Sequence, residues 1–190
     1  MELLKLAKEI KEGFQVPTVI LPQIFKDDRG HFFESYNKKE FFDSVYLTDF
    51  VQDNESKSSY GVLRGLHFQK PPYEQAKLVR VISGEGVVVA VDLRKDSPYY
   101  KMYFSALLSE ENHRQFYIPS GFAHGFLALR DNTIFQYKCS NFYNKQSEES
   151  VYYDDPEIGI PWGQWINPQD IKLSDKDRTN KFFEEIENPF

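Results

Sequence analysis

The chain has 190 residues, of which 41% are hydrophobic and 16% aromatic, and its formal net charge is -6 at pH 7. This length suffices for one domain with a hydrophobic core, and the acidic balance without a long basic run argues against a nucleic-acid partner. A single cysteine, Cys139, excludes an intrachain disulfide framework and a cysteine-based zinc site. We therefore expect one domain over residues 1–190.

The first residues have the pattern of a short amphipathic helix, which we expect over residues 1–13. Four apolar residues share one face of that helix: Leu3, Leu6, Ala7 and Ile10. Lysine and glutamate interrupt the segment, and it lacks a small-residue cleavage site, which argues against a signal peptide. No apolar run is as long as a membrane span. We expect a cytoplasmic protein with no membrane partner.

Short strands and one helix are predicted before residue 61. Pro17 and Pro22 interrupt an apolar run, which favours short edge strands, and Asn37 can cap a helix. The expected elements are edge strands within 16–25, a strand over 31–36, a helix over 38–46, a strand over 50–54 and a polar loop over 55–60.

Strands separated by turns dominate residues 61–142. Turn residues recur between apolar and aromatic runs, a pattern typical of a β-sandwich or barrel. The predicted strands are 62–69, 77–83, 87–93, 100–108, 115–118, 123–129 and 133–142. After residue 154 loops prevail, and a helical tail is expected over 178–190.

Arg64 and His67 interrupt the apolar strand 62–69, and a buried cation or imidazole requires polar partners. On a regular strand these two side chains point to opposite faces, but a bulge at Gly65 would turn both to one side. Other polar residues within apolar strands are Lys77, His124 and Tyr137. Taken singly, each of these residues also fits a purely structural position.

Pro119, Gly121 and His124 have the spacing of the second half of a cupin metal motif. The first half should supply two histidines separated by one residue, and a glutamate, yet at that place the chain has His67, Phe68 and Gln69. Glutamine is a poor ligand for zinc or iron. We therefore expect no metal, and a metal-dependent cupin enzyme is kept as an alternative.

The polar residues belong to segments whose order is distinctive: 28–35, 62–69, 77–81, 89–98, 118–126, 137–139, 154–156 and 173–177. Together these segments resemble the dTDP-4-dehydrorhamnose 3,5-epimerase family, from about residue 19 to residue 177. The resemblance implies an all-β, cupin-type jelly roll (a double-stranded β-helix) with short peripheral helices. It also implies a homodimer that exchanges N-terminal strands.

The resemblance further implies a role for each candidate site residue. His67 matches the base, Asp177 its dyad partner, and Tyr137 the acid. Lys77 matches the residue beside the sugar ketone oxygen. The substrate-binding positions are Gln52, Asn54, Arg64, His124, Tyr143 and Lys176, with Arg29 and Glu34 reaching the nucleotide of the neighbouring subunit.

The activity implied is that of a cofactor-free isomerase acting on a dTDP-4-keto-6-deoxy sugar. It would invert C3 and C5 on the route to dTDP-L-rhamnose. Two further alternatives are a C3-only epimerase on a related nucleotide-4-keto sugar and a non-catalytic sugar-nucleotide binding module. The chain departs from the family pattern at Ala76, 86–88, 116–117 and 150–153, which concerns the pocket walls and leaves the sugar and nucleotide open.

The chemistry explains why these residue types are needed. A proton beside a ketone is weakly acidic, so its removal needs a base such as neutral His67. A carboxylate such as Asp177 fixes the tautomer of the ring and stabilises the imidazolium. A cation stabilises the enolate, and inversion needs an acid on the opposite face, for which we expect Lys77 and Tyr137. Residues 173–177 must then fold back to His67.

Overall fold

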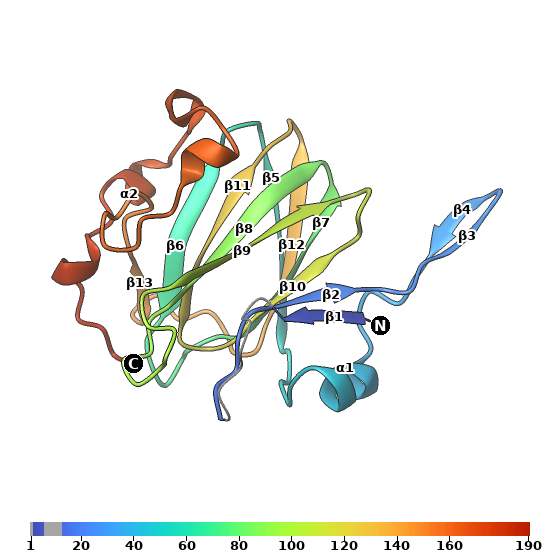
Figure 1. The fold of residues 1–190 in the computed structure, drawn as a ribbon, viewed down its shortest axis with the longest axis horizontal. Coiled ribbons are helices and arrows are strands. Elements are labelled where there is room, and N and C mark those ends of the chain that lie inside the picture. The colour runs from blue at the N-terminus through green and yellow to red at the C-terminus, as the bar shows by residue number, and fades with distance from the viewer. Residues whose placement is uncertain (1, 6–12) are drawn as a thin grey trace.

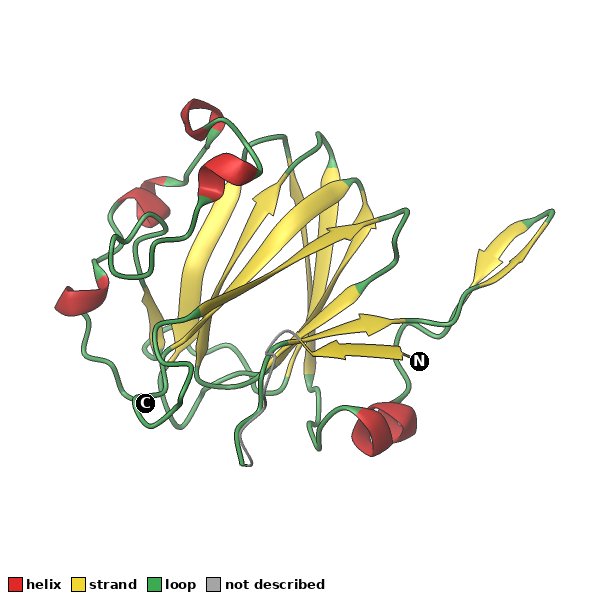
Figure 2. Ribbon diagram, viewed as in Figure 1, coloured by secondary structure: helices red, strands yellow, loops and turns green. Residues whose placement is uncertain are grey.

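The computed structural model describes residues 2–5 and 13–190, and two antiparallel β-sheets that face each other form its centre (Figures 1 and 2). The first sheet consists, in spatial order, of β1 (Glu2–Lys5), β2 (Thr18–Leu21), β10 (Gln115–Ile118), β7 (Lys77–Ser83), β12 (Thr133–Cys139) and β5 (Gln52–Ser58). The second consists of β13 (Glu148–Ser150), β6 (Leu63–Gln69), β11 (Phe122–Ala128), β8 (Glu85–Asp92) and β9 (Tyr103–Ser109). Most neighbouring strands are distant in sequence, and this is the jelly roll that was predicted.

The remaining elements lie around the two sheets. A hairpin of β3 (Phe25–Asp27) and β4 (Gly30–Phe32) projects away from them (Figure 1). Helix α1 (Lys38–Ser44) begins at Asn37, whose side chain accepts hydrogen bonds from two backbone N–H groups, as predicted. The C-terminal part contains η1 (Trp162–Gln164), η2 (Pro168–Asp170), α2 (Asp175–Arg178) and η3 (Phe183–Glu185).

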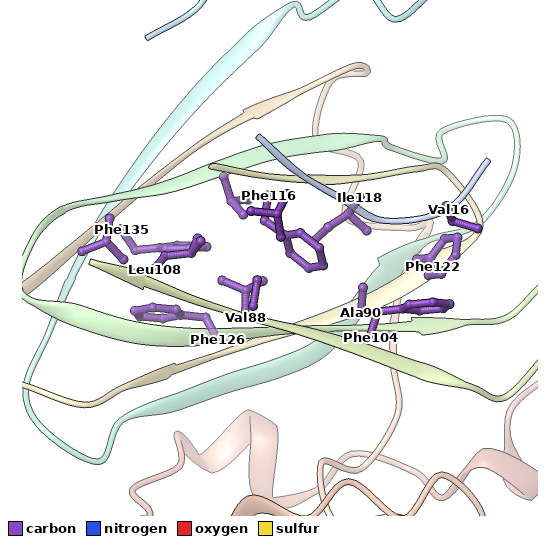
Figure 3. Close-up of a cluster of buried hydrophobic side chains, with 14 of the residues drawn as sticks. Val16, Val88, Ala90, Phe104, Leu108, Phe116, Ile118, Phe122, Phe126 and Phe135 are labelled. Carbon is purple, nitrogen blue, oxygen red and sulfur yellow. The ribbon is translucent and has the colours of Figure 1, made fainter. Parts of the chain in front are cut away.

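The main hydrophobic core fills the space between the sheets (Figure 3). Side chains alternate along each strand, so Val79 and Val81 of β7 point into this core while Leu78 points outward. Phe126 of β11 stacks on Phe135 of β12 with ring centroids 4.1 Å apart. Burying each such large apolar side chain stabilises the fold by roughly 1.5–3 kcal/mol. This packing holds the two sheets in a fixed position relative to each other.

The outer faces of both sheets are also covered. Phe41 of α1 packs on the first sheet against Leu78 and Tyr117. The C-terminal segment packs on the second sheet, where Trp162 and Phe183 are buried among residues of β6, β8 and β11. Figure 1 shows this segment in orange and red beside β6. The packing explains how Asp177 comes close to β6.

Two predictions about the chain ends are wrong. Glu2–Lys5 forms the strand β1, paired with β2, rather than the start of a helix; the rest of the predicted helix lies largely outside the described residues. Backbone pairing with β2 outweighs the weak helical preference of a short segment. The tail over 178–190 is not helical apart from the end of α2 and the three residues of η3. Instead, its buried side chains Phe183 and Ile186 pack against the apolar residues of β6 and β8.

Predictions for the polar strands also need correction. The predicted loop over 55–60 continues β5 to Ser58, because β5 pairs with β12 along its whole length. Of the strand predicted over 31–36, only His31 and Phe32 belong to β4, and β13 was not predicted. These strands carry polar residues on exposed edges, so their pattern lacks the apolar alternation that identifies strands. No helix in the described part of the chain is long and apolar enough to cross a membrane.

Candidate active site

A bulge in β6 brings Arg64 and His67 to one face, as predicted. Against β11, His67 pairs with His124 and Arg64 with Phe126, so three steps on β6 match two on β11. Gly65 has φ +141°, and a Cβ there would lie 2.6 Å from the Cα of Gly125. Only glycine fits this backbone position. Leu63 and Leu66 consequently share the outer, apolar face.

His67 forms a hydrogen bond with Asp177, with Nε2 2.6 Å from Oδ1. Asp177 is 4% exposed, and its other oxygen accepts a 2.7 Å bond from the Ser174 hydroxyl. Burial by itself raises the pKa of Asp177, but the hydrogen bonds from His67 and Ser174 outweigh it and hold the pKa below its ordinary value. The carboxylate is therefore ionised beside the ring, and Nδ1 of His67 has no hydrogen-bond partner in the described part of the chain.

Lys77 and His124 form a second buried pair beside His67. Nδ1 of His124 donates to the backbone carbonyl of His67 at 2.8 Å, and Nε2 lies 3.0 Å from Lys77 Nζ. Burial, with the nearby charges of Lys77 and His67, lowers the pKa of His124 well below its ordinary value. Burial also lowers the pKa of Lys77 to about 8. Neutral His124 therefore accepts a hydrogen bond from a lysine that is a cation at neutral pH.

Tyr137 extends from the opposite sheet, where β12 pairs with β5 and β7. Burial is the largest cause that raises its pKa, while the charge of Arg64 and a hydrogen bond with Asn54 act in the other direction. The phenol therefore keeps its proton at neutral pH and can donate it. The Lys77 ammonium lies 5.5 Å from the centre of its ring.

These groups line one cavity of about 290 Å³ at the end of the space between the sheets. Its walls are Gln52, Asn54, His67, Phe68, Gln69, Gln75, Lys77, His124, Tyr137, Tyr143 and Glu148. Seven of these had been predicted as site residues, and Asp177 lies behind His67. The histidines belong to the second sheet, whereas Lys77 and Tyr137 belong to the first. A molecule in the cavity is thus placed between His67 and Tyr137.

Glu148 is a site residue that the sequence did not reveal. Its carboxylate accepts hydrogen bonds from the Tyr143 hydroxyl at 3.1 Å and from Lys176 at 2.6 Å. Burial opposes its ionisation, but the bonds from Lys176 and Tyr143 and the charge of His67 lower its pKa on balance. Lys176, predicted as a binding residue, is held at the rim by this pair. The only signal was a glutamate within a polar run, at the start of the short strand β13.

Gln69 has a structural role that explains why it is not a second histidine. Its amide nitrogen donates to the carbonyl oxygens of Tyr73 and Phe142, and its oxygen accepts from the N–H of Asn144. The buried amide thus joins the two loops that edge the cavity. A single imidazole has too few donors and acceptors for these three bonds.

Besides Lys176, three predicted binding residues do not line this cavity. Arg64 is exposed next to it and donates to Ser58 at 3.3 Å. Arg29 lies on the projecting hairpin, 90% exposed and paired with Asp27 at 2.6 Å. Glu34 follows that hairpin and accepts from the Asn37 side chain. Within one chain, the structure does not bring Arg29 or Glu34 to the cavity.

The donor set does not fit a resident metal. Nε2 of His67 is bonded to Asp177, and both ring nitrogens of His124 are engaged with Lys77 and a carbonyl oxygen. Among residues 2–5 and 13–190, no group of three or more histidine, cysteine and acidic side chains could hold a metal ion.

Fold and site together define a cupin-type protein whose cavity is lined by two histidines, a lysine and a tyrosine. The profile of the dTDP-4-dehydrorhamnose 3,5-epimerase family matches residues 13–185. A protein of that name from Methanothermobacter thermautotrophicus is 48% identical over 172 residues, covering 90% of this chain and 92% of the relative. The chain therefore belongs to the dTDP-4-dehydrorhamnose 3,5-epimerase family.

Two solved structures extend the comparison. A dTDP-6-deoxy-D-glucose-3,5-epimerase from Legionella pneumophila in complex with dTDP-4-keto-L-rhamnose is 41% identical with a TM-score of 0.87, covering 98% of this chain and 95% of that one. A 3'-monoepimerase from Streptomyces bikiniensis in complex with dTDP-quinovose is 32% identical with a TM-score of 0.80, covering 87% and 83%. The same fold thus carries single and double epimerases.

Proposed function

We propose that this protein is an isomerase that inverts C3 and C5 of a dTDP-4-keto-6-deoxyhexose in the biosynthesis of dTDP-L-rhamnose. The reaction requires no cofactor. The observation that carries the proposal is the position of His67, paired with Asp177, across one cavity from Tyr137 and Lys77. A base, a fixed cation and a second acid are the groups that inversion beside a ketone requires. Similarity to named 3,5-epimerases over most of the chain supports the same conclusion.

In this mechanism His67 Nδ1 removes the proton from C3 while Asp177 stabilises the resulting imidazolium. The electron pair of the broken C–H bond moves to the ketone oxygen, and Lys77 stabilises the enolate. The Tyr137 hydroxyl then delivers a proton to the opposite face of the carbon. Exchange with water returns both residues to their starting states, and the sequence repeats at C5.

The remaining binding residues surround the nucleotide and the sugar. Gln52, Asn54, His124 and Tyr143 line the cavity, and Arg64 beside it offers a forked donor to the diphosphate. We propose a cytoplasmic homodimer in which N-terminal strands are exchanged. The projecting hairpin supports this part of the proposal, since it would carry Arg29 and Glu34 to the nucleotide of the partner subunit.

The test is incubation with dTDP-4-keto-6-deoxyglucose in deuterated water, followed by NMR of the sugar. Deuterium at both C3 and C5 with an L-configured product is expected. Deuterium at C3 alone would identify a monoepimerase, which the similarity to the Streptomyces bikiniensis enzyme makes the second candidate. Binding of dTDP without deuterium at either carbon would contradict both and leave a sugar-nucleotide binding module. The dimer is tested by light scattering.

A further inference from the structure

Asn180 lies three residues after Asp177 and bridges two strands of the second sheet. Its Nδ2 donates to the carbonyl oxygen of Gly65 at 3.0 Å, and its Oδ1 accepts from the Ser150 hydroxyl at 2.7 Å. The side chain is half-buried, and both bonds reach residues more than twenty positions away. A side chain that donates and accepts at once has a single orientation.

Both partners of Asn180 are adjacent to the catalytic pair. Gly65 forms the bulge in β6 that turns His67 toward the cavity. Ser150 is the residue of β13 that pairs with His67 itself. The N–H of Gly65 also contributes to the lowered pKa of Asp177. The side chain of Asn180 therefore connects the strand that carries His67 to the segment that carries Asp177.

Backbone hydrogen bonds to the rest of the fold hold both ends of the segment 172–181. The middle of this segment is positioned by side-chain contacts. Lys172 pairs with Gly61 and Leu63 before α2, and the carbonyl of Lys181 accepts from Tyr152 after it. Between these anchors, α2 is only four residues long. A short helix has little stability of its own, so side-chain contacts decide its position.

We propose that Asn180 is a positioning residue for the His67–Asp177 pair, an inference that rests on the proposed function. By holding the bulge against the end of α2, it keeps the Asp177 carboxylate on Nε2 of His67. That bond leaves the proton on Nε2 and the lone pair of Nδ1 free to accept the substrate proton. A supporting group of this kind matters because a small misplacement of a catalytic pair lowers the rate strongly.

The experiment compares Asn180→Ala, Ser150→Ala, the double variant and a matched control, Asn188→Ala. Asn188 belongs to the same tail and donates an equivalent bond, to the carbonyl of Leu93 at 2.7 Å, outside the cavity. The first readout is the ¹⁵N spectrum of the His67 ring, which reports its tautomer without any turnover. The second is kcat against KM on the 4-keto sugar.

Asn180→Ala is expected to give a mixture of His67 tautomers and to lower kcat about tenfold with little change in KM. Ser150→Ala should have a smaller effect that is not additive with it. Asn188→Ala should retain the single tautomer and the wild-type kcat. If Asn180→Ala fails to fold, Asn180→Asp replaces it, because a carboxylate cannot donate to Gly65 while keeping the acceptor for Ser150.

A wild-type His67 tautomer in the folded Asn180 variant would overturn the proposal, as would equal changes in the variant and the Asn188 control. The spectrum decides this question even for a protein that does not turn over the sugar. Absence of turnover by the wild-type protein would contradict the proposed function alone.

Discussion

His67 and Asp177 are 110 positions apart in the sequence, yet Nε2 of one lies 2.6 Å from Oδ1 of the other. The N-terminal cap of α2 creates this contact. Ser174 caps the helix by accepting the N–H of Asp177, and its hydroxyl donates back to Oδ2 of the same residue. One serine thus both begins the helix and orients the carboxylate, which leaves Oδ1 for His67.

Asp177→Asn is expected to lower kcat by about a hundredfold or more, because an amide can donate to Nε2 and favour the wrong tautomer of His67. The measurement is steady-state kinetics on the 4-keto sugar together with deuterium exchange at C3. Asp175→Asn is the matched control, since Asp175 lies on the same short helix but is exposed. Equal loss of kcat in both variants would contradict a specific role for Asp177.

Strands that are buried on both faces were predictable from the sequence as apolar runs between turn residues. The predicted strands 77–83 and 115–118 match β7 and β10 at both ends, since a buried strand requires mostly apolar side chains. The edge strands β5 and β13 were missed or shortened because no core demands apolar residues there. Only the pairing partner, which is remote in sequence, defines such strands.

The site was predictable where polar residues break an apolar strand. Lys77, His124 and Tyr137 stand out for this reason, and the glycine between Arg64 and His67 indicated the bulge. Asp177 lies in a polar segment and was found only through the resemblance to the family. Glu148 had no comparable signal, because its place in the site depends on contacts with Tyr143 and Lys176 that exist only in the folded protein. The placement of Arg29 and Glu34 at a partner's site stays a prediction.

Lys77 should give the activity and the stability opposite dependences on alkaline pH. Burial lowers its pKa from 10.5 to about 8, so the cation that stabilises the enolate is lost as the pH rises through about 8. Between 8 and 10.5 the unfolded chain binds more protons than the folded one, so the free energy of unfolding rises with pH there. The shift of the Lys77 pKa corresponds to a change in the free energy of unfolding on the order of 3 kcal/mol across this pH range.

Two measurements check this prediction for the wild-type protein. The pH profile of kcat/KM, which reports the free enzyme, should fall on its alkaline side near 8, and denaturant unfolding should show the stability gain between about 8 and 10.5. Lys77→Met should lose most of the activity and remove the Lys77 contribution to the pH dependence of stability. A wild-type kcat/KM that stays constant through this range would contradict the role of the Lys77 cation.

Tyr137→Phe should separate proton removal from inversion. Without the phenol the base remains, so deuterium still enters at C3 through His67, while the inverted product forms about 10²–10⁴-fold more slowly. NMR of the sugar after incubation in deuterated water measures both quantities. Tyr117→Phe is the control, a buried tyrosine that bonds Thr48 and does not line the cavity. Wild-type inversion by the Tyr137 variant would assign the second acid to another group.

Gly65→Ala tests whether the bulge in β6 requires glycine. A Cβ at this position would meet the backbone of Gly125 at 2.6 Å and the carbonyl of His124 at 3.0 Å, and neither can move without disturbing β11. We expect the free energy of unfolding to fall by about 3 kcal/mol or more, with loss of activity. Denaturant unfolding and the deuterium assay measure the two effects.

Gly30→Ala separates this steric conflict from the cost of the backbone angle alone. Gly30 has φ +131°, close to the +141° of Gly65, but a Cβ there would meet nothing within 4 Å. The substitution should therefore cost only about 1 kcal/mol, from the left-handed conformation. If both alanine variants lose the same stability, the backbone angle explains the need for glycine. A larger loss at Gly65 means that contact with β11 dictates the bulge, and with it the direction of His67.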